Sequence, residues 1–253
     1  MTRPRIAAAA VVLVLAIGAG GYVAYDQILR GDSVAPLALP SPAPSPAGDA
    51  ASAAPPATDG PAASPDRPAR VGDLAGTWTV STGSQAGYRV REQLANLPAE
   101  SDAVGRTDRV TGSITVADDG TTSSVTAGTI QVDTTTITSD KPQRDNRLRN
   151  EGLQTDSYPS ASFRLTQPLD IATAAVSGES LDITLVGELT LHGVTKSVAI
   201  PAKAQLAGGT IQVAGSVSFP LSDYAMTAPN IGGFIVSIAD QGTLEFVLVF
   251  TRG

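Results

Sequence analysis

Regular alternation of apolar and polar side chains constrains the fold of this chain more than any other feature. In the longest run, residues 181–191, the odd positions are apolar or glycine and most even positions are polar. Similar rows occupy residues 161–165, 198–206 and 211–219. Successive side chains of a β-strand point to opposite faces of the sheet, so this period of two predicts strands with one buried and one exposed face.

Short turn signals separate these rows, for example at Ala207–Thr210 and at Asp240–Gly242. We count about eight strands, several of them long. Antiparallel strands that follow one another through short turns predict an all-β fold, either an up-and-down barrel or a sandwich. A closed barrel also leaves no open sheet edge, and eight strands leave room for one elongated ligand.

One segment departs from the alternation. Residues 139–152 read SDKPQRDNRLRNEG. Asp140 is a candidate helix cap, Pro142 fits a first turn and Gly152 can end the helix. We therefore expect a short helix over Lys141–Glu151.

The first thirty residues contain a membrane-length apolar run. Residues 6–25 carry no charge and follow Arg3 and Arg5. Twenty helical residues span ~30 Å, the hydrocarbon thickness of a bilayer, and the basic flank predicts a cytoplasmic N-terminus. Two interpretations stay open for residues 1–30: an uncleaved signal anchor, which we favour, or a signal peptide cleaved near Gly18–Gly21 that releases a secreted domain. Both place the rest of the chain outside the cytoplasm.

A linker follows the apolar run. Residues 31–70 hold ten of the 18 prolines, with mostly Ala, Ser, Gly and Asp around them. Such a segment buries too little apolar surface to offset its ordering entropy, so we expect a disordered tether. It is either a stalk that holds the following domain, residues 71–253, away from the membrane or an inert connection.

Composition excludes several classes of function. The chain has no cysteine, which excludes disulfides, thiolate zinc sites and cysteine nucleophiles, and it has one histidine, His192. The formal net charge of −7 argues against general nucleic-acid binding. No G-x-S-x-G motif or other catalytic constellation accompanies His192, so we expect neither an enzyme nor a metal site.

Four segments resemble the YceI-like family by their order and spacing along residues 76–250. They are Gly76–Val80, Gly112–Val116, Arg144–Phe163 and Gly187–Val198. The resemblance implies an eight-stranded, lipocalin-like antiparallel barrel that encloses an isoprenoid lipid, such as a polyprenyl phosphate or a quinone. The histidine common in the family's first hairpin is absent, and residues 87–92 read GYRVRE instead.

The candidate ligand contacts are apolar side chains of the predicted inner faces. They are Tyr88, Val90, Phe163, Leu165, Ile183, Leu185, Leu189, Val213, Val217, Phe219, Phe234 and Phe246. The candidates for a lipid head group are cationic: Arg89, Arg91, Arg144, Arg147 and His192. A guanidinium matches phosphate oxygens, but the arginines also fit solvated faces, and His192 fits a turn residue that bonds to backbone.

The sequence thus predicts a membrane-tethered, extracytoplasmic protein that holds an isoprenoid lipid for transport or storage, without catalysis. Its expected partners are that lipid and the cytoplasmic membrane, and its only cofactor would be the bound polyisoprenoid or quinone. Two alternatives remain: a protein-interaction module with a solid core, and an enzyme that acts around His192.

Overall fold

The computed structural model describes residues 34–40, 74–94, 100–118, 122–171, 179–228 and 235–253. The predicted membrane anchor, residues 1–30, lies outside these ranges, and so does most of the predicted linker. In the part that is described, no helix is long and apolar enough to cross a bilayer.

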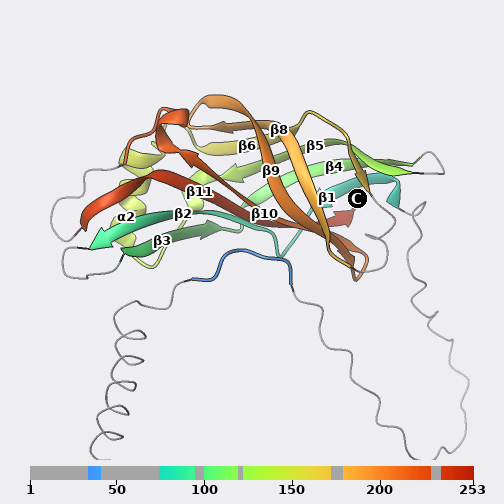
Figure 1. Cartoon of the computed structure of the whole chain (residues 1–253), viewed down its shortest axis with the longest axis horizontal. Coiled ribbons are helices and arrows are strands. Elements are labelled where there is room, and N and C mark those ends of the chain that lie inside the picture. Colours follow the sequence, from blue (N-terminus) through green and yellow to red (C-terminus); the bar gives the residue numbers. More distant parts are fainter. Residues whose placement is uncertain (1–33, 41–73, 95–99, 119–121, 172–178, 229–234) are drawn as a thin grey trace, which may run out of the picture.

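The described strands form one antiparallel sheet (Figure 1). They are β1 Gly76–Val80, β2 Gln85–Leu94, β3 Glu100–Thr107, β4 Val110–Asp118, β5 Ser123–Asp133, β6 Ser160–Leu165, β7 Leu169–Ile171, β8 Leu181–Leu191, β9 Val194–Ala207, β10 Thr210–Pro220 and β11 Ile235–Arg252.

The sheet closes into a barrel through β11. This strand pairs with β10 along one edge, while its other edge pairs first with β2 and then with β1. β1 and β2 therefore form one bent wall strand, β3 and β4 form the next, and β6 and β7 both pair with β5. Counted this way, eight wall strands follow one another in chain order, which confirms the predicted up-and-down antiparallel barrel.

Short helices lie between some of the strands. They are the 3₁₀ turn η2 Thr134–Thr136, the α-helix α2 Pro142–Arg147, the π-helical turn η3 Leu148–Gly152 and the 3₁₀ turn η5 Leu221–Tyr224. Figure 1 shows α2 at one end of the barrel and the C-terminus at the other. We call these the α2 end and the far end.

The helix lies where the sequence predicts it, but it is capped differently. The α-helix stops at Arg147 and continues as the π-helical turn to Gly152. Asp140 does not cap it, because its carboxylate pairs with the Arg144 guanidinium instead. The residue at the cap position, Lys141, makes no side-chain capping bond.

One predicted turn is correct and one is wrong. Ala207 pairs with Thr210 across Gly208 and Gly209, whose positive φ angles of 56° and 74° suit a tight hairpin. The turn predicted at Asp240–Gly242 is instead an irregularity inside β11. Between the pairs Ile238–Glu92 and Gly242–Val90, β11 advances four residues while β2 advances two, so the extra residues bulge out and the strand continues.

Two clusters of buried apolar residues pack inside the barrel. Trp78 and Phe250 belong to the cluster that includes Leu74, and the Trp78 indole N–H donates to the Leu74 carbonyl oxygen at 2.9 Å. The second cluster surrounds Tyr224, whose ring meets Phe219 edge to face with centroids 4.9 Å apart.

Gly187 tests the closeness of packing in the wall. A Cβ at Gly187 would collide with the Phe163 ring and the Arg164 carbonyl oxygen. We expect Gly187→Ala to lower the free energy of unfolding by about 1–3 kcal/mol in urea titrations, since overpacking forces such shifts. Gly128→Ala is the control, because its Cβ would come no closer than 3.3 Å to the Ile114 side chain. Equal stability of the two variants would contradict this packing.

Candidate functional site

The interior of the barrel contains an apolar cavity of ≈ 290 Å³. Each strand from β2 to β11 contributes side chains to its lining, because alternation points every second residue inward. Eleven of the twelve candidate ligand contacts line this cavity: Tyr88, Val90, Phe163, Leu165, Ile183, Leu185, Leu189, Val213, Val217, Phe219 and Phe246. Phe234 lies outside the described residues. The structure thus brings together candidates that are up to 158 residues apart in the chain, from Tyr88 to Phe246.

Several lining residues escaped the sequence analysis. Ile130 and Val132 of β5 line the cavity, as do Leu148 and Leu153 beside the helix. The Ser and Thr residues of β5 hide its alternation, although Ile130 and Val132 lie two residues apart. The helix residues carried no signal of their own, because only the docking of the helix on the barrel brings them inside.

Polar side chains line the cavity at the α2 end. Arg144 and Arg147, three residues apart and therefore on one face of the helix, both reach it. The Arg144 guanidinium bonds to the Glu92 carboxylate at 2.5 Å, and Glu92 is only 3% exposed. Glu92 was missed as a site residue, yet it follows Tyr88 and Val90 on the inward parity of β2, where a carboxylate is unexpected.

Three donor atoms of cavity-lining residues have no hydrogen-bond partner among the described residues, and neither does Nε2 of His192, which does not line the cavity. The three donors are the Tyr88 hydroxyl, Arg144 Nε and Arg147 Nη1, and all three are buried. Within the described ranges, Arg147 also forms no ion pair, unlike Arg144. Because unpaired buried donors are costly, this arrangement is suited to a ligand that brings acceptor oxygens to the end of an apolar cavity.

Burial and charge set the protonation of these groups. Burial raises the pKa of the Tyr88 hydroxyl to about 12, from an ordinary 10.0, and nearby Arg144 lowers it only in part. Burial alone would lower the pKa of Arg144, but the Glu92 and Asp140 carboxylates outweigh burial and raise it. Tyr88 is therefore a neutral donor and Arg144 a cation at physiological pH.

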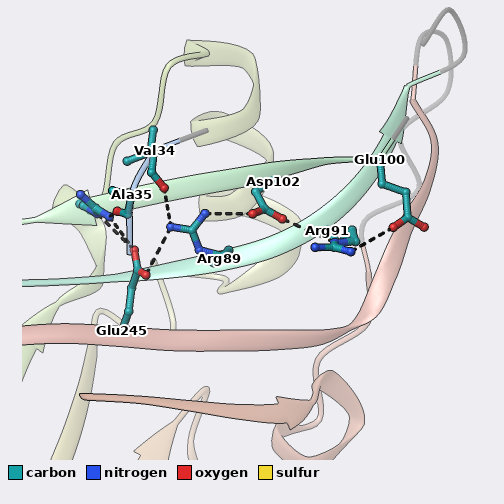
Figure 2. A network of polar contacts seen from close by, with 8 residues as sticks. Val34, Ala35, Arg89, Arg91, Glu100, Asp102 and Glu245 are labelled. Carbon is teal, nitrogen blue, oxygen red and sulfur yellow. Dashed lines mark hydrogen bonds and ion pairs between the residues drawn. The ribbon is translucent and has the colours of Figure 1, made fainter. Parts of the chain in front are cut away.

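The structure does not bring Arg89 and Arg91 to the cavity. Both point to the outer face of β2, as the alternation with inward Tyr88 and Val90 requires. Arg89 bonds to Asp102 at 3.0 Å, and Arg91 contacts Glu100 at 3.4 Å with its side chain 63% exposed (Figure 2). Of the four candidate arginines, only Arg144 and Arg147 line the cavity.

His192 lies in the turn between β8 and β9, at positive φ of 50°. Its Nδ1 is 3.1 Å from the Tyr224 carbonyl oxygen, and its ring packs on Tyr158 with centroids 4.4 Å apart. It is buried and does not line the cavity. These contacts match the interpretation of a turn residue that bonds to backbone.

The likeness to known proteins agrees with this architecture. The model of the YceI-like domain matches residues 78–250. Protein YceI of Shigella flexneri is 39% identical over 75 residues, which are 29% of this chain and 35% of that protein, so the chain aligns with about a third of the relative.

Two solved structures share the fold. A polyisoprenoid-binding domain from Saccharophagus degradans superposes with a TM-score of 0.54 at 19% identity, over 70% of this chain and 98% of that one. BcnA of Burkholderia cenocepacia superposes with a TM-score of 0.52 at 16% identity, over 67% of this chain and 98% of BcnA.

The raised pKa of Tyr88 predicts a loss of stability in alkali. In the folded state Tyr88 keeps its proton to about pH 12, whereas the unfolded chain releases it near pH 10. The stability that this group contributes is therefore complete below pH 10 and is lost as the pH rises to about 12. Between pH 8 and pH 11 the free energy of unfolding should fall by about 1.4 kcal/mol more in the wild type than in Tyr88→Phe. Parallel curves for the two proteins in urea titrations would contradict the burial of this hydroxyl.

Proposed function

The chain belongs to the YceI-like family, and from this premise we propose that its barrel binds an isoprenoid lipid and carries or stores it. The single observation that carries the proposal is the apolar cavity, whose lining residues Tyr88, Arg144 and Arg147 hold buried donors without a partner among the described residues. The likeness to a polyisoprenoid-binding domain supports the same ligand class.

The hydrocarbon chain occupies the space between the strands. Burial of each methylene contributes ~0.8 kcal/mol before entropic costs, so a few isoprene units give useful affinity. The lining is almost wholly apolar along the walls, and side chains such as Ile183, Leu185 and Val217 are only half-buried. A bound chain would cover this remaining surface.

The head group lies at the α2 end. The Tyr88 hydroxyl, Arg144 Nε and Arg147 Nη1 offer donors and no other described polar atom claims them. An acceptor-bearing head group, either a phosphate or a quinone carbonyl, satisfies them. Arg147 adds a positive charge that no described carboxylate neutralises, which favours phosphate of the two.

The N-terminal apolar run places this barrel outside the cytoplasm and tethers it to the membrane that contains its lipid. This location rests on residues 6–25 and their basic flank. A lipid carrier of this kind works close to a bilayer, because its cargo is released and collected there.

The alternatives are less well supported. A solid-core interaction module is at odds with the cavity of ≈ 290 Å³. An enzyme centred on His192 lacks support because that ring is packed on Tyr158, and its Nδ1 lies against a backbone carbonyl oxygen. We therefore assign binding and not catalysis.

A bulky side chain in the cavity tests whether the hydrocarbon chain of the lipid binds there. We expect Ile183→Trp to lose most of the lipid that mass spectrometry detects in the purified protein, because the indole occupies the lipid's space. Thr184→Trp is the matched control, since Thr184 is exposed on the outer face of the same strand. Retention of lipid by Ile183→Trp, or its absence from the wild type even after incubation with polyprenyl phosphate and with quinone, would refute the proposal.

Removal of one helix charge tests the head-group position. A hydrogen bond to a charged group is worth about 1.5–3 kcal/mol, so Arg147→Met should weaken polyprenyl phosphate binding at least about tenfold. Arg149→Met is the control, because Arg149 bonds to Asn146 and Ile137 and does not line the cavity. Fluorescence titration with polyprenyl phosphate and with a quinone distinguishes the two head groups. Equal affinities in both variants would place the head group elsewhere.

A further inference from the structure

Residues Val34–Pro40, which belong to the predicted linker, lie against the outer wall of the barrel; we call them the strap. Figure 1 shows the strap in blue beneath the barrel. Arg89 Nη2 donates to the Val34 carbonyl oxygen at 2.7 Å, and Arg106 Nη2 donates to that of Ala35. The linker is therefore not free along its whole length, contrary to the sequence-based expectation.

The other end of the strap is also held. Gln205 Nε2 donates to the Pro40 carbonyl oxygen at 3.3 Å and to Gln212 at 2.8 Å. The strap thus crosses from the wall formed by β2 and β3 to the wall formed by β9 and β10. Three backbone carbonyls at separate points bind three side chains of the barrel.

A buried carboxylate organises the arginines that bind the strap. Glu245 of β11 also borders the cavity, but its carboxylate lies on the outer face with Arg89 and Arg106, as alternation with inward Leu244 and Phe246 requires, and the residue is only 3% exposed. Its oxygens lie 2.9 Å from Arg106 Nη2 and 3.5 Å from Arg89 Nη2 (Figure 2). Glu245 therefore holds both guanidinium groups where they meet the strap carbonyls.

The wall around these contacts is buried although it faces outward. By strand register, the side chains of Val104, Ala214, Gln205 and Val247 share the outer face with Arg89 and Glu245, and each is 8% exposed or less. Outer positions of a bare barrel wall face water instead.

The strap itself is two-sided. Leu37 and Leu39 are half-buried, whereas Pro36, Ala38 and Pro40 are exposed. This alternation places the two leucines toward the barrel. A strap built only of inert linker would show no such difference between its two faces.

The strap has a direction along the barrel. Val34 binds at Arg89, three residues along β2 from Glu92, which contacts the helix at the α2 end. Pro40 binds at Gln205, beside the hairpin at residues 207–210. Three residues of strand, at ~3.3 Å each, place the start of the strap ~10 Å from the α2 end. The strap then runs toward the far end of the barrel.

We propose that the docked strap is a clasp that shortens the tether and keeps the α2 end of the barrel toward the membrane. The inference rests on the proposed membrane anchor. Only residues 26–33 then separate the apolar run from the docked strap, and they reach at most ~30 Å. Release of the strap would lengthen the connection to residues 26–73, with a maximum reach of ~160 Å. The clasp therefore presents the head-group end of the cavity to the bilayer.

Docking of the strap is measured first in the full chain. The chain has no native cysteine, so Leu37→Cys and Ala38→Cys give single labelling sites. We expect slower maleimide labelling at position 37 than at 38, and loss of this difference when the strap is broken by replacement of Arg89 and Arg106 with alanine. Equal maleimide labelling rates at positions 37 and 38, with Arg89 and Arg106 intact, would overturn the clasp.

Orientation is measured in phosphatidylcholine vesicles that contain a quencher on the lipid head group. Fluorophores on Gln143→Cys in α2 and on Thr251→Cys at the far end report distance from the bilayer, since both positions are exposed. We expect stronger quenching at position 143. Leu37→Asp with Leu39→Asp should abolish the difference, whereas Ala38→Asp, on the exposed face of the strap, should preserve it.

The outcomes separate this inference from the proposed function. Equal quenching at the two positions, or a difference that survives the leucine substitutions, overturns the clasp. A chain that does not float with the vesicles overturns the clasp and the anchor together. Lipid binding is scored separately by mass spectrometry, and the strap variants should retain their isoprenoid lipid, because Leu37 and Leu39 do not line the cavity.

Discussion

The structure depends on the closure of the sheet through β11. This strand runs from Ile235 to Arg252 and is long enough to bond to β10 on one edge and to both β2 and β1 on the other. Closure satisfies the backbone groups of a strand that would otherwise form an open edge. It also converts a one-faced sheet into a wall around an interior, which is why alternate residues from β2 to β11 meet at one cavity.

The ends of the barrel differ in chemistry. At the far end, Trp78 and Phe250 pack into an apolar cluster, with the Arg252 guanidinium over the indole at 5.4 Å from its centroid. At the α2 end, the helix brings two arginines over the cavity and Glu92 pairs with one of them. Buried charges need partners, so the polar groups left without one are informative. They support the proposed position of an oxygen-bearing head group.

On the outer wall, a buried charge has its partners. Glu245 is buried on the outside of the barrel, between Arg89 and Arg106, and the strap carbonyls complete the network. Here the partners all come from the chain itself. In the inner network Arg144 pairs with Glu92, but three donors have no partner among the described residues, whereas the outer network holds a segment of the linker.

Sequence alone determined much of the wall. A period of two in the apolar residues predicts which side of each strand faces inward, and this was sufficient to select the cavity-lining side chains of β8 and β10. Local chemistry also predicted the hairpin at Gly208–Gly209 and the site of the helix at Pro142, because glycine permits positive φ angles and proline fixes φ near its helical value. The apolar run at residues 6–25 predicts export, and the described ranges do not include it.

Only the tertiary structure decided what depends on distant contacts. The bulge in β11 near Asp240 looked like a turn, since a break in alternation does not reveal whether the neighbouring strand continues beside it. Glu92 and Glu245 became site residues through partners at Arg144 and Arg106, 52 and 139 residues away. The strap looked like disordered linker because its own composition buries little. Its order comes from the barrel wall, which exists only after residues 85–250 have folded, and no local pattern in residues 34–40 encodes that surface.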